Sequence, residues 1–181
     1  MTERLTLSDP VSAQADQKTV TASRVRTNEL VMPNDTNPLG NLMGGILLKW
    51  MDVSSAISAQ RHCNRHVVTV AVDTVEFLSP IRLGEIVVIE GEVSRAFNTS
   101  MEVSMHVWAE NLRRGTRRLC TTSYYTFVAV DADANPVPVP AIIPESEYEK
   151  EQFEQAGERR RIRLEQSKKN KELRRKLEDA M

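Results

Sequence analysis

Residues able to do chemistry lie close together in one stretch of this chain. The sequence reads Asn41-Leu42-Met43-Gly44-Gly45, and Asp52 follows seven positions after Gly45. A carboxylate acts as a general base or as a nucleophile, and an amide orients water or binds a carbonyl group. Between Gly45 and Asp52 the residues are apolar except for one lysine, which predicts a buried helix. A charge is kept inside such a helix only if it is stabilised or used, so the stretch indicates an enzyme.

The predicted helix start supplies hydrogen-bond donors. The first N–H groups of a helix have no partner within it, and the macrodipole makes that end partly positive. Gly44 and Gly45 have no Cβ, so a substrate can approach the backbone closely. We therefore expect the Gly45 N–H to stabilise an oxyanion, with Asp52 as base or nucleophile and Asn41 orienting water or the carbonyl. The structural alternatives are an ion pair of Asp52 with Lys49, a turn role for Asn41, and glycines that serve only packing.

The totals predict one soluble domain. The chain has 181 residues, 40% of them hydrophobic, a net charge of −1 and only two cysteines. No run reaches the ~18–20 apolar residues of a membrane span, so we expect no membrane insertion. Two cysteines cannot form a disulfide framework for a domain of this size, and the N-terminus lacks the apolar run of a secretory signal. These features favour a cytoplasmic protein without a metal site or a bound cofactor.

The pattern predicts an α+β fold with a helix at residues 44–62 and five strands, at residues 21–32, 67–77, 85–96, 100–110 and 117–130. Short loops between the later strands favour antiparallel hairpins. Several strands are apolar on both faces while one helix covers only one face, which predicts an oligomer. We divide the chain into a flexible N-terminus (1–20), the domain (21–140) and a charged helical tail (141–181).

Several motifs in this order resemble those of one family. They include Leu39-Gly40-Asn41-Leu42-Met43-Gly44-Gly45, Trp50-Met51-Asp52, Arg61-His62-Cys63-Asn64, Val68-Thr69-Val70-Ala71-Val72-Asp73, Phe77-Leu78-Ser79-Pro80, Gly84-Glu85 and Thr99-Ser100-Met101-Glu102-Val103. Together they resemble the acyl-CoA thioesterases (acyl-CoA hydrolases) of the hotdog fold. The resemblance implies a long buried helix wrapped by a curved five-stranded antiparallel sheet. It also implies hydrolysis of acyl-coenzyme A to a carboxylic acid and coenzyme A, with Asn41 and Asp52 as the functional pair.

Helix geometry predicts a site shared between chains. Asp52 lies eight residues after Gly44, about 12 Å along the helix axis, whereas Asn41 lies beyond the helix start. One chain can hardly bring both side chains to one carbonyl, but two chains related by a twofold axis can. The family resemblance implies the same arrangement. We expect at least a dimer, assembled further into a trimer of dimers.

Other residues are candidates for binding the substrate. They are Gly44, the hairpin residues Asn98, Thr99 and Ser100, and two arginines able to meet coenzyme A phosphates, Arg82 and Arg95. The basic tail reads as a solvated helix, and we expect no nucleic-acid binding. Two other functions stay open. One is an acyl-CoA-sensing module without catalysis, and the other is a hotdog hydratase or dehydratase, although residues 39–49 contain no histidine for that chemistry.

Overall fold

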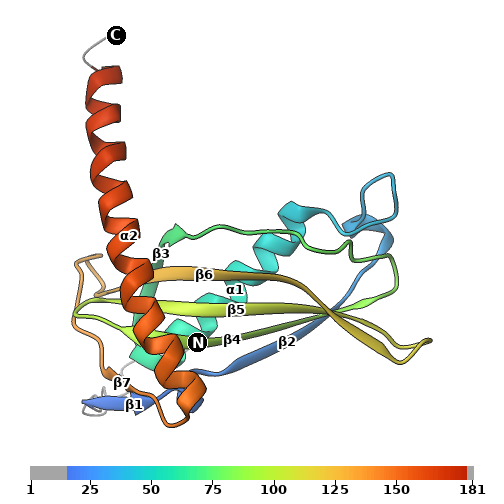
Figure 1. Cartoon of the computed structure of the whole chain (residues 1–181), viewed down its shortest axis with the longest axis horizontal. Coiled ribbons are helices and arrows are strands. Elements are labelled where there is room, and N and C mark those ends of the chain that lie inside the picture. Colours follow the sequence, from blue (N-terminus) through green and yellow to red (C-terminus); the bar gives the residue numbers. More distant parts are fainter. Residues whose placement is uncertain (1–15, 179–181) are drawn as a thin grey trace, which may run out of the picture.

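A computed structural model describes residues 16–178 and shows one long helix, α1, held in a curled sheet (Figure 1). The elements in chain order are β1 (Gln17–Thr19), η1 (Thr21–Ser23), β2 (Val25–Leu30), η2 (Pro33–Asp35), α1 (Gly44–Cys63), β3 (His66–Val72), β4 (Ile86–Ala96), β5 (Ser100–Asn111), β6 (Thr116–Val130), β7 (Ala141–Ile143) and α2 (Glu147–Glu178). No helix within residues 16–178 is long and apolar enough to cross a membrane.

The main sheet has the strand order β2-β4-β5-β6-β3, and every neighbouring pair is antiparallel. Alternation along β5 decides which face is buried, and all five inward residues are fully buried: Met101, Val103, Met105, Val107 and Ala109. They pack with the buried residues of α1, such as Met51. Register shifts, each with one extra residue in β3, β4 or β6, bend the strands around the helix. This arrangement confirms the predicted hotdog fold.

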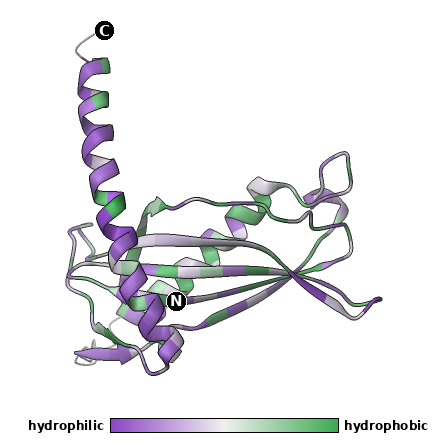
Figure 2. Ribbon diagram, in the orientation of Figure 1, coloured by the Kyte–Doolittle hydropathy of each residue, from purple (hydrophilic) through white to green (hydrophobic). Residues whose placement is uncertain are grey.

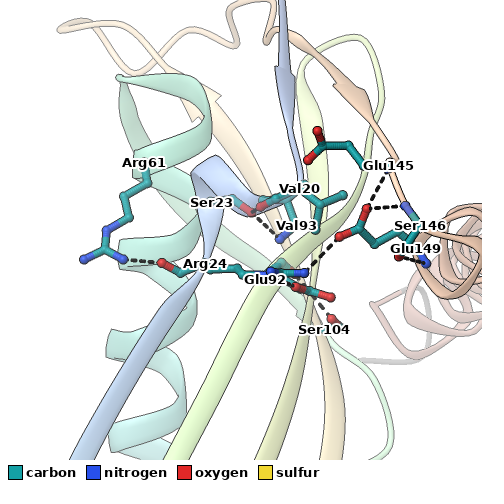
Figure 3. A network of polar contacts seen from close by, with 10 residues as sticks. All are labelled: Val20, Ser23, Arg24, Arg61, Glu92, Val93, Ser104, Glu145, Ser146 and Glu149. Carbon is teal, nitrogen blue, oxygen red and sulfur yellow. Dashed lines mark hydrogen bonds and ion pairs between the residues drawn. The ribbon is translucent and has the colours of Figure 1, made fainter.

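The second helix, α2, lies on the opposite side of the sheet from α1 and is largely hydrophilic (Figures 1 and 2). Its start is fixed by a polar network (Figure 3), in which Arg24 binds both Glu92 of β4 and Glu149 of α2, at 2.8 and 2.9 Å. The Glu149 carboxylate in turn accepts hydrogen bonds from the N–H groups of Glu145 and Ser146. A carboxylate at this helix end is favoured by the unpaired N–H groups and by the macrodipole.

Three expectations need correction. Part of the segment expected to be flexible, Gln17–Thr19, forms β1 and pairs with β7, because Val20 is buried beside it; residues 1–15 of that segment lie outside the described part. The strand expected to run to residue 77 ends at Val72. The helix α1 is not buried all round, since Val53 is 52% exposed on a single chain.

Candidate active site

The start of α1 presents two free hydrogen-bond donors. Met43 is the N-cap residue, and its carbonyl accepts from the N–H groups of both Ile46 and Leu47 at 3.1 Å. The N–H groups of Gly44 and Gly45 donate to no acceptor within the described residues. A Cβ on Gly45 would meet no atom within 4 Å, whereas one on Gly44 would lie 3.2 Å from the Phe77 ring. The space beside Gly45 is therefore open to a ligand at the positive end of the helix.

The loop before α1 is shaped by a second asparagine, Asn37. Its Oδ1 accepts from the N–H groups of Leu39 and Asn41, at 3.0 and 3.2 Å, and its own N–H donates to the Asn41 carbonyl at 2.8 Å. Among the described residues, neither the Asn37 amide nitrogen nor the Asn41 side chain forms a hydrogen bond. Two half-buried asparagines, each with an amide group that donates no hydrogen bond within the described residues, thus lie in the loop before the helix start.

Asp52 lies two turns inside α1 and is held by the sheet. Its Oδ1 accepts a hydrogen bond from the Thr69 hydroxyl on β3, at 2.9 Å. Burial, with the Asp52 charge as a second cause, raises the pKa of the nearby Tyr125 hydroxyl to about 12. Within the described residues, Asp52 forms no ion pair with Lys49, and its carboxylate binds Thr69 instead. The structural alternative, in which Asp52 serves only to pair with Lys49, is therefore not realised. Thr69 was missed from the sequence.

The two halves of the predicted site lie apart within one chain. Asp52 is eight residues from Gly44 on a continuous helix, which corresponds to about 12 Å. The Asp52 carboxylate instead lies beneath β3, an edge strand of the sheet. Because Asp52 is far from the start of its own helix, a second group that acts together with its carboxylate would have to come from another chain.

The remaining predicted binding residues are scattered. Arg82 bridges to the backbone of Asn41, so it lies beside the helix start and is exposed. Arg95 lies against α2, where its Nη1 donates to the Phe153 carbonyl at 2.9 Å and its guanidinium stacks on the Phe153 ring. The hairpin residues 98–100 use their carbonyls within the fold; those of Asn98 and Thr99 accept from the N–H groups of Val139 and Ala129. Only Arg82 is brought to the helix start.

The architecture and these groups, a carboxylate and free backbone donors on one helix inside a hotdog sheet, define a class of thioester-cleaving proteins. A family model described as the thioesterase superfamily matches residues 39–116. An uncharacterized acyl-CoA thioester hydrolase of Bacillus subtilis is 44% identical over 127 residues, which are 70% of this chain and 74% of that protein.

Solved structures agree with the family model. An apo-hexameric acyl-CoA thioesterase gives a TM-score of 0.82 at 39% identity, covering 84% of this chain and 97% of that chain. The acyl-CoA hydrolase of Staphylococcus aureus, in complex with butyryl coenzyme A, coenzyme A and coenzyme A disulfide, gives 0.79 at 36% identity, covering 86% and 97%. The chain belongs to the thioesterase superfamily, and within it to the hotdog-fold acyl-CoA thioester hydrolases. The predicted family and enzyme class are confirmed.

Three further structures of the Staphylococcus aureus enzyme carry alanine in place of an asparagine, an aspartate and a threonine. In that protein the aspartate follows the asparagine by fifteen positions, and the threonine follows the aspartate by seventeen.

Proposed function

We propose that this enzyme hydrolyses acyl-coenzyme A to a carboxylic acid and coenzyme A at a site shared by two copies of the chain. The observation that carries the proposal is the position of Asp52, which is hydrogen-bonded to Thr69 under the free edge of the sheet. The substrate class is supported by the names of the similar proteins and by the coenzyme A bound to one of them. The coenzyme is part of the substrate, and the reaction needs no further cofactor.

The partner half of the site comes from pairing of β3 with β3 of a second copy. β3 pairs only with β6 in the described chain, so its outer N–H and C=O groups are left for another strand. Three of its valines, Val68, Val70 and Val72, are between 45% and 54% exposed. The other edge strand, β2, exposes one large apolar residue, Leu30 at 52%, together with the polar residues Arg26 and Asn28. A twofold axis perpendicular to the two paired β3 strands brings the helix start of one copy toward Asp52 of the other and makes two equal sites.

The spacing of the three substituted residues in the Staphylococcus aureus enzyme supports particular roles here. Asp52 and Thr69 are also seventeen positions apart, and the residue fifteen positions before Asp52 is Asn37. Asn37 therefore competes with the predicted Asn41 as the amide of the site. In each, the amide group can donate to a substrate carbonyl or to a water molecule.

The chemistry follows from the groups available. The Gly45 N–H, and the Gly44 N–H beside it, stabilise the negative charge that develops on the thioester oxygen. Asp52 either removes a proton from the attacking water or adds to the carbonyl, which gives an anhydride that water then cleaves. In both cases the C–S bond breaks, coenzyme A leaves as a thiolate that takes up a proton, and the acid is released. Thr69 positions the Asp52 carboxylate.

Higher assembly and location follow from the relatives. A hexameric structure among the similar proteins supports a trimer of dimers for this chain. A cytoplasmic location is supported by a relative described as a cytosolic acyl coenzyme A thioester hydrolase, from Rattus norvegicus.

The test is coenzyme A release from palmitoyl-coenzyme A, followed with a thiol reagent, for wild type and for Asp52→Ala, Asn37→Ala and Asn41→Ala. We expect wild type to turn over, Asp52→Ala to be nearly inactive with an unchanged fold, and one asparagine variant to lose far more activity than the other. Binding without turnover by the wild type would instead identify an acyl-CoA-sensing module. Full activity of Asp52→Ala would refute the proposed mechanism.

A further inference from the structure

The helix α2 crosses the outside of the sheet strand by strand. Near its start, the Phe153 carbonyl accepts from Arg95 of β4. One and a half turns later, Arg159 binds Glu102 of β5 at 2.8 Å, and after another turn Arg163 binds Asp73, the residue following β3, also at 2.8 Å. The direction of α2 therefore follows the strand order from β4 to the β3 edge.

The helix does not stop at that edge. It runs for a further fifteen residues to Glu178, about 22 Å at ~1.5 Å per residue, and this half projects beyond β3 (Figure 1). Among the described residues, nothing packs against its end, where Leu173 and Leu177 are 57% and 60% exposed. An isolated helix of this length is marginal in water, because helix stability in proteins comes chiefly from packing.

The side of α2 that faces the sheet continues past the edge of the sheet and becomes apolar toward the end of the helix. Starting from Arg163, steps of three and four residues lead to Gln166, Asn170, Leu173 and Leu177, which share one face of the helix. Gln166 and Asn170 line a cavity of about 670 Å³ between α2 and the end of β3. The two leucines follow on the same face, where the single chain offers no surface to cover them. Figure 2 shows a few short apolar bands along the otherwise hydrophilic α2.

We propose that this projecting half of α2, residues 164–178, docks on the outer face of the sheet of a second copy, over its β3 and β6 strands. The inference rests on the pairing of β3 edges proposed above, which continues the sheet of one copy into the other. An antiparallel pair of His66–Val72 strands puts the end of one β3, where α2 crosses, beside the start of the other. In each copy, that start is paired with the end of β6, His66 opposite Val130.

Charge and apolar surface on the second copy match the helix. Residues 164–178 contain six lysines and arginines against three glutamates. The turn after β6 carries Asp131 and Asp133, both exposed. The Asn135 N–H donates to the Asp131 carboxylate and holds its pKa below the ordinary value, so this charge persists at neutral pH. Val68, on the outward side of β3 and 45% exposed, offers the leucines an apolar contact.

The test is cross-linking of the full chain with a short bismaleimide. Leu173→Cys is combined with Ala132→Cys, in the turn between the two aspartates, and covalent dimer is measured on a denaturing gel. Leu164→Cys with Ala132→Cys is the matched control, because Leu164 is comparably exposed at 48% and lies nine residues before Leu173, on the opposite side of the helix. The native Cys63 and Cys120 are buried, and each single-cysteine variant serves as a blank.

We expect covalent dimer from the Leu173 pair and its loss in the Leu164 pair. A Val70→Cys variant, near the middle of β3, reports the edge pairing separately through a disulfide between copies. If Val70→Cys cross-links but the Leu173 pair does not, the docking of α2 is refuted and the edge-paired dimer stands. If neither cross-links, the edge pairing and the docking are both refuted.

Discussion

Removing the guanidinium that fixes α2 to the sheet should cost a large part of the protein's stability. Glu102 is fully buried, and its Oε1 accepts from Arg159 at 2.8 and 3.1 Å and from the Ser94 hydroxyl at 2.8 Å. The same guanidinium lies 3.7 Å from the centre of the Tyr124 ring. Arg159→Ala therefore leaves a buried carboxylate without its main partner and also removes a cation–π contact.

The expected loss can be bounded from these contacts. Breaking a buried ion pair by removing one partner costs about 3–5 kcal/mol. Arg163 lies 3.6 Å from the other oxygen of Glu102 and offsets part of this, so we expect about 3 kcal/mol. For a chain of this length, that loss lowers Tm by about 6–12 °C. Adding Glu102→Gln to Arg159→Ala should recover part of the loss, because a neutral amide is less costly to leave without its partner than a carboxylate.

The measurement is thermal unfolding by circular dichroism at one fixed protein concentration, since assembly makes Tm depend on concentration. Arg161→Ala is the matched control, because Arg161 lies on the same helix and pairs only with exposed glutamates. It should leave Tm unchanged within error. An Arg159→Ala variant as stable as the Arg161→Ala control would refute the docking of α2 on this sheet.

Three further outcomes are expected. Gly45→Ala should leave Tm unchanged, because a Cβ at this position meets no atom within 4 Å. The variant should have a lower kcat, because the methyl group fills the space beside the Gly45 N–H. Activity equal to that of the wild type would contradict the oxyanion role. Burial lowers the pKa of His62 below 6.5, so the unfolded chain takes up the proton first and stability is lost as pH falls below about 6.5. Tm measured between pH 5 and 8 should show that slope. The His62→Gln variant should have a weaker slope, and part of it should stay because burial also lowers the pKa of His106. His66→Gln, a substitution at an exposed site, should leave the slope unchanged. Arg82→Ala should raise KM for acyl-coenzyme A with little change in Tm, whereas Arg95→Ala should lower Tm. The reverse result would show that Arg95 binds the substrate and that Arg82 stabilises the fold.

The elements with a strong local pattern could be predicted from the sequence. The alternation along residues 100–110 gave β5 and its buried face, and the glycines before an apolar run gave the start of α1 at Gly44. Strands β1 and β7 have three residues each, too few for any periodic signal, and their pairing joins segments more than a hundred positions apart. The expected strand end at residue 77 was wrong, because beyond Val72 only isolated bonds, such as Leu78 N–H to the Cys120 carbonyl, follow β6.

The candidate site was predicted only in part, and for similar reasons. Asp52 was recognisable because a carboxylate is unusual in an apolar helix. Thr69 was not, since a threonine in a valine-rich strand looks like any other strand-forming residue. Arg95 differs from Arg82 only through the packing of α2, which no local pattern encodes. Asn37 and Asn41 are both ordinary turn residues, so their chemistry depends on which side chain reaches the neighbouring copy.

The central claim is that each active site uses Asp52 of one chain and the helix start of another. Chains carrying Asp52→Ala and chains carrying an asparagine variant, Asn37→Ala or Asn41→Ala, are unfolded together, refolded and assayed for coenzyme A release. With random pairing half of the dimers are mixed and each mixed dimer has one intact site, so we predict recovery to about a quarter of wild-type activity. Recovery should occur with the asparagine that is inactive on its own. A mixture that stays inactive, although wild type refolds under the same conditions, would place both residues in one chain's site and contradict the account.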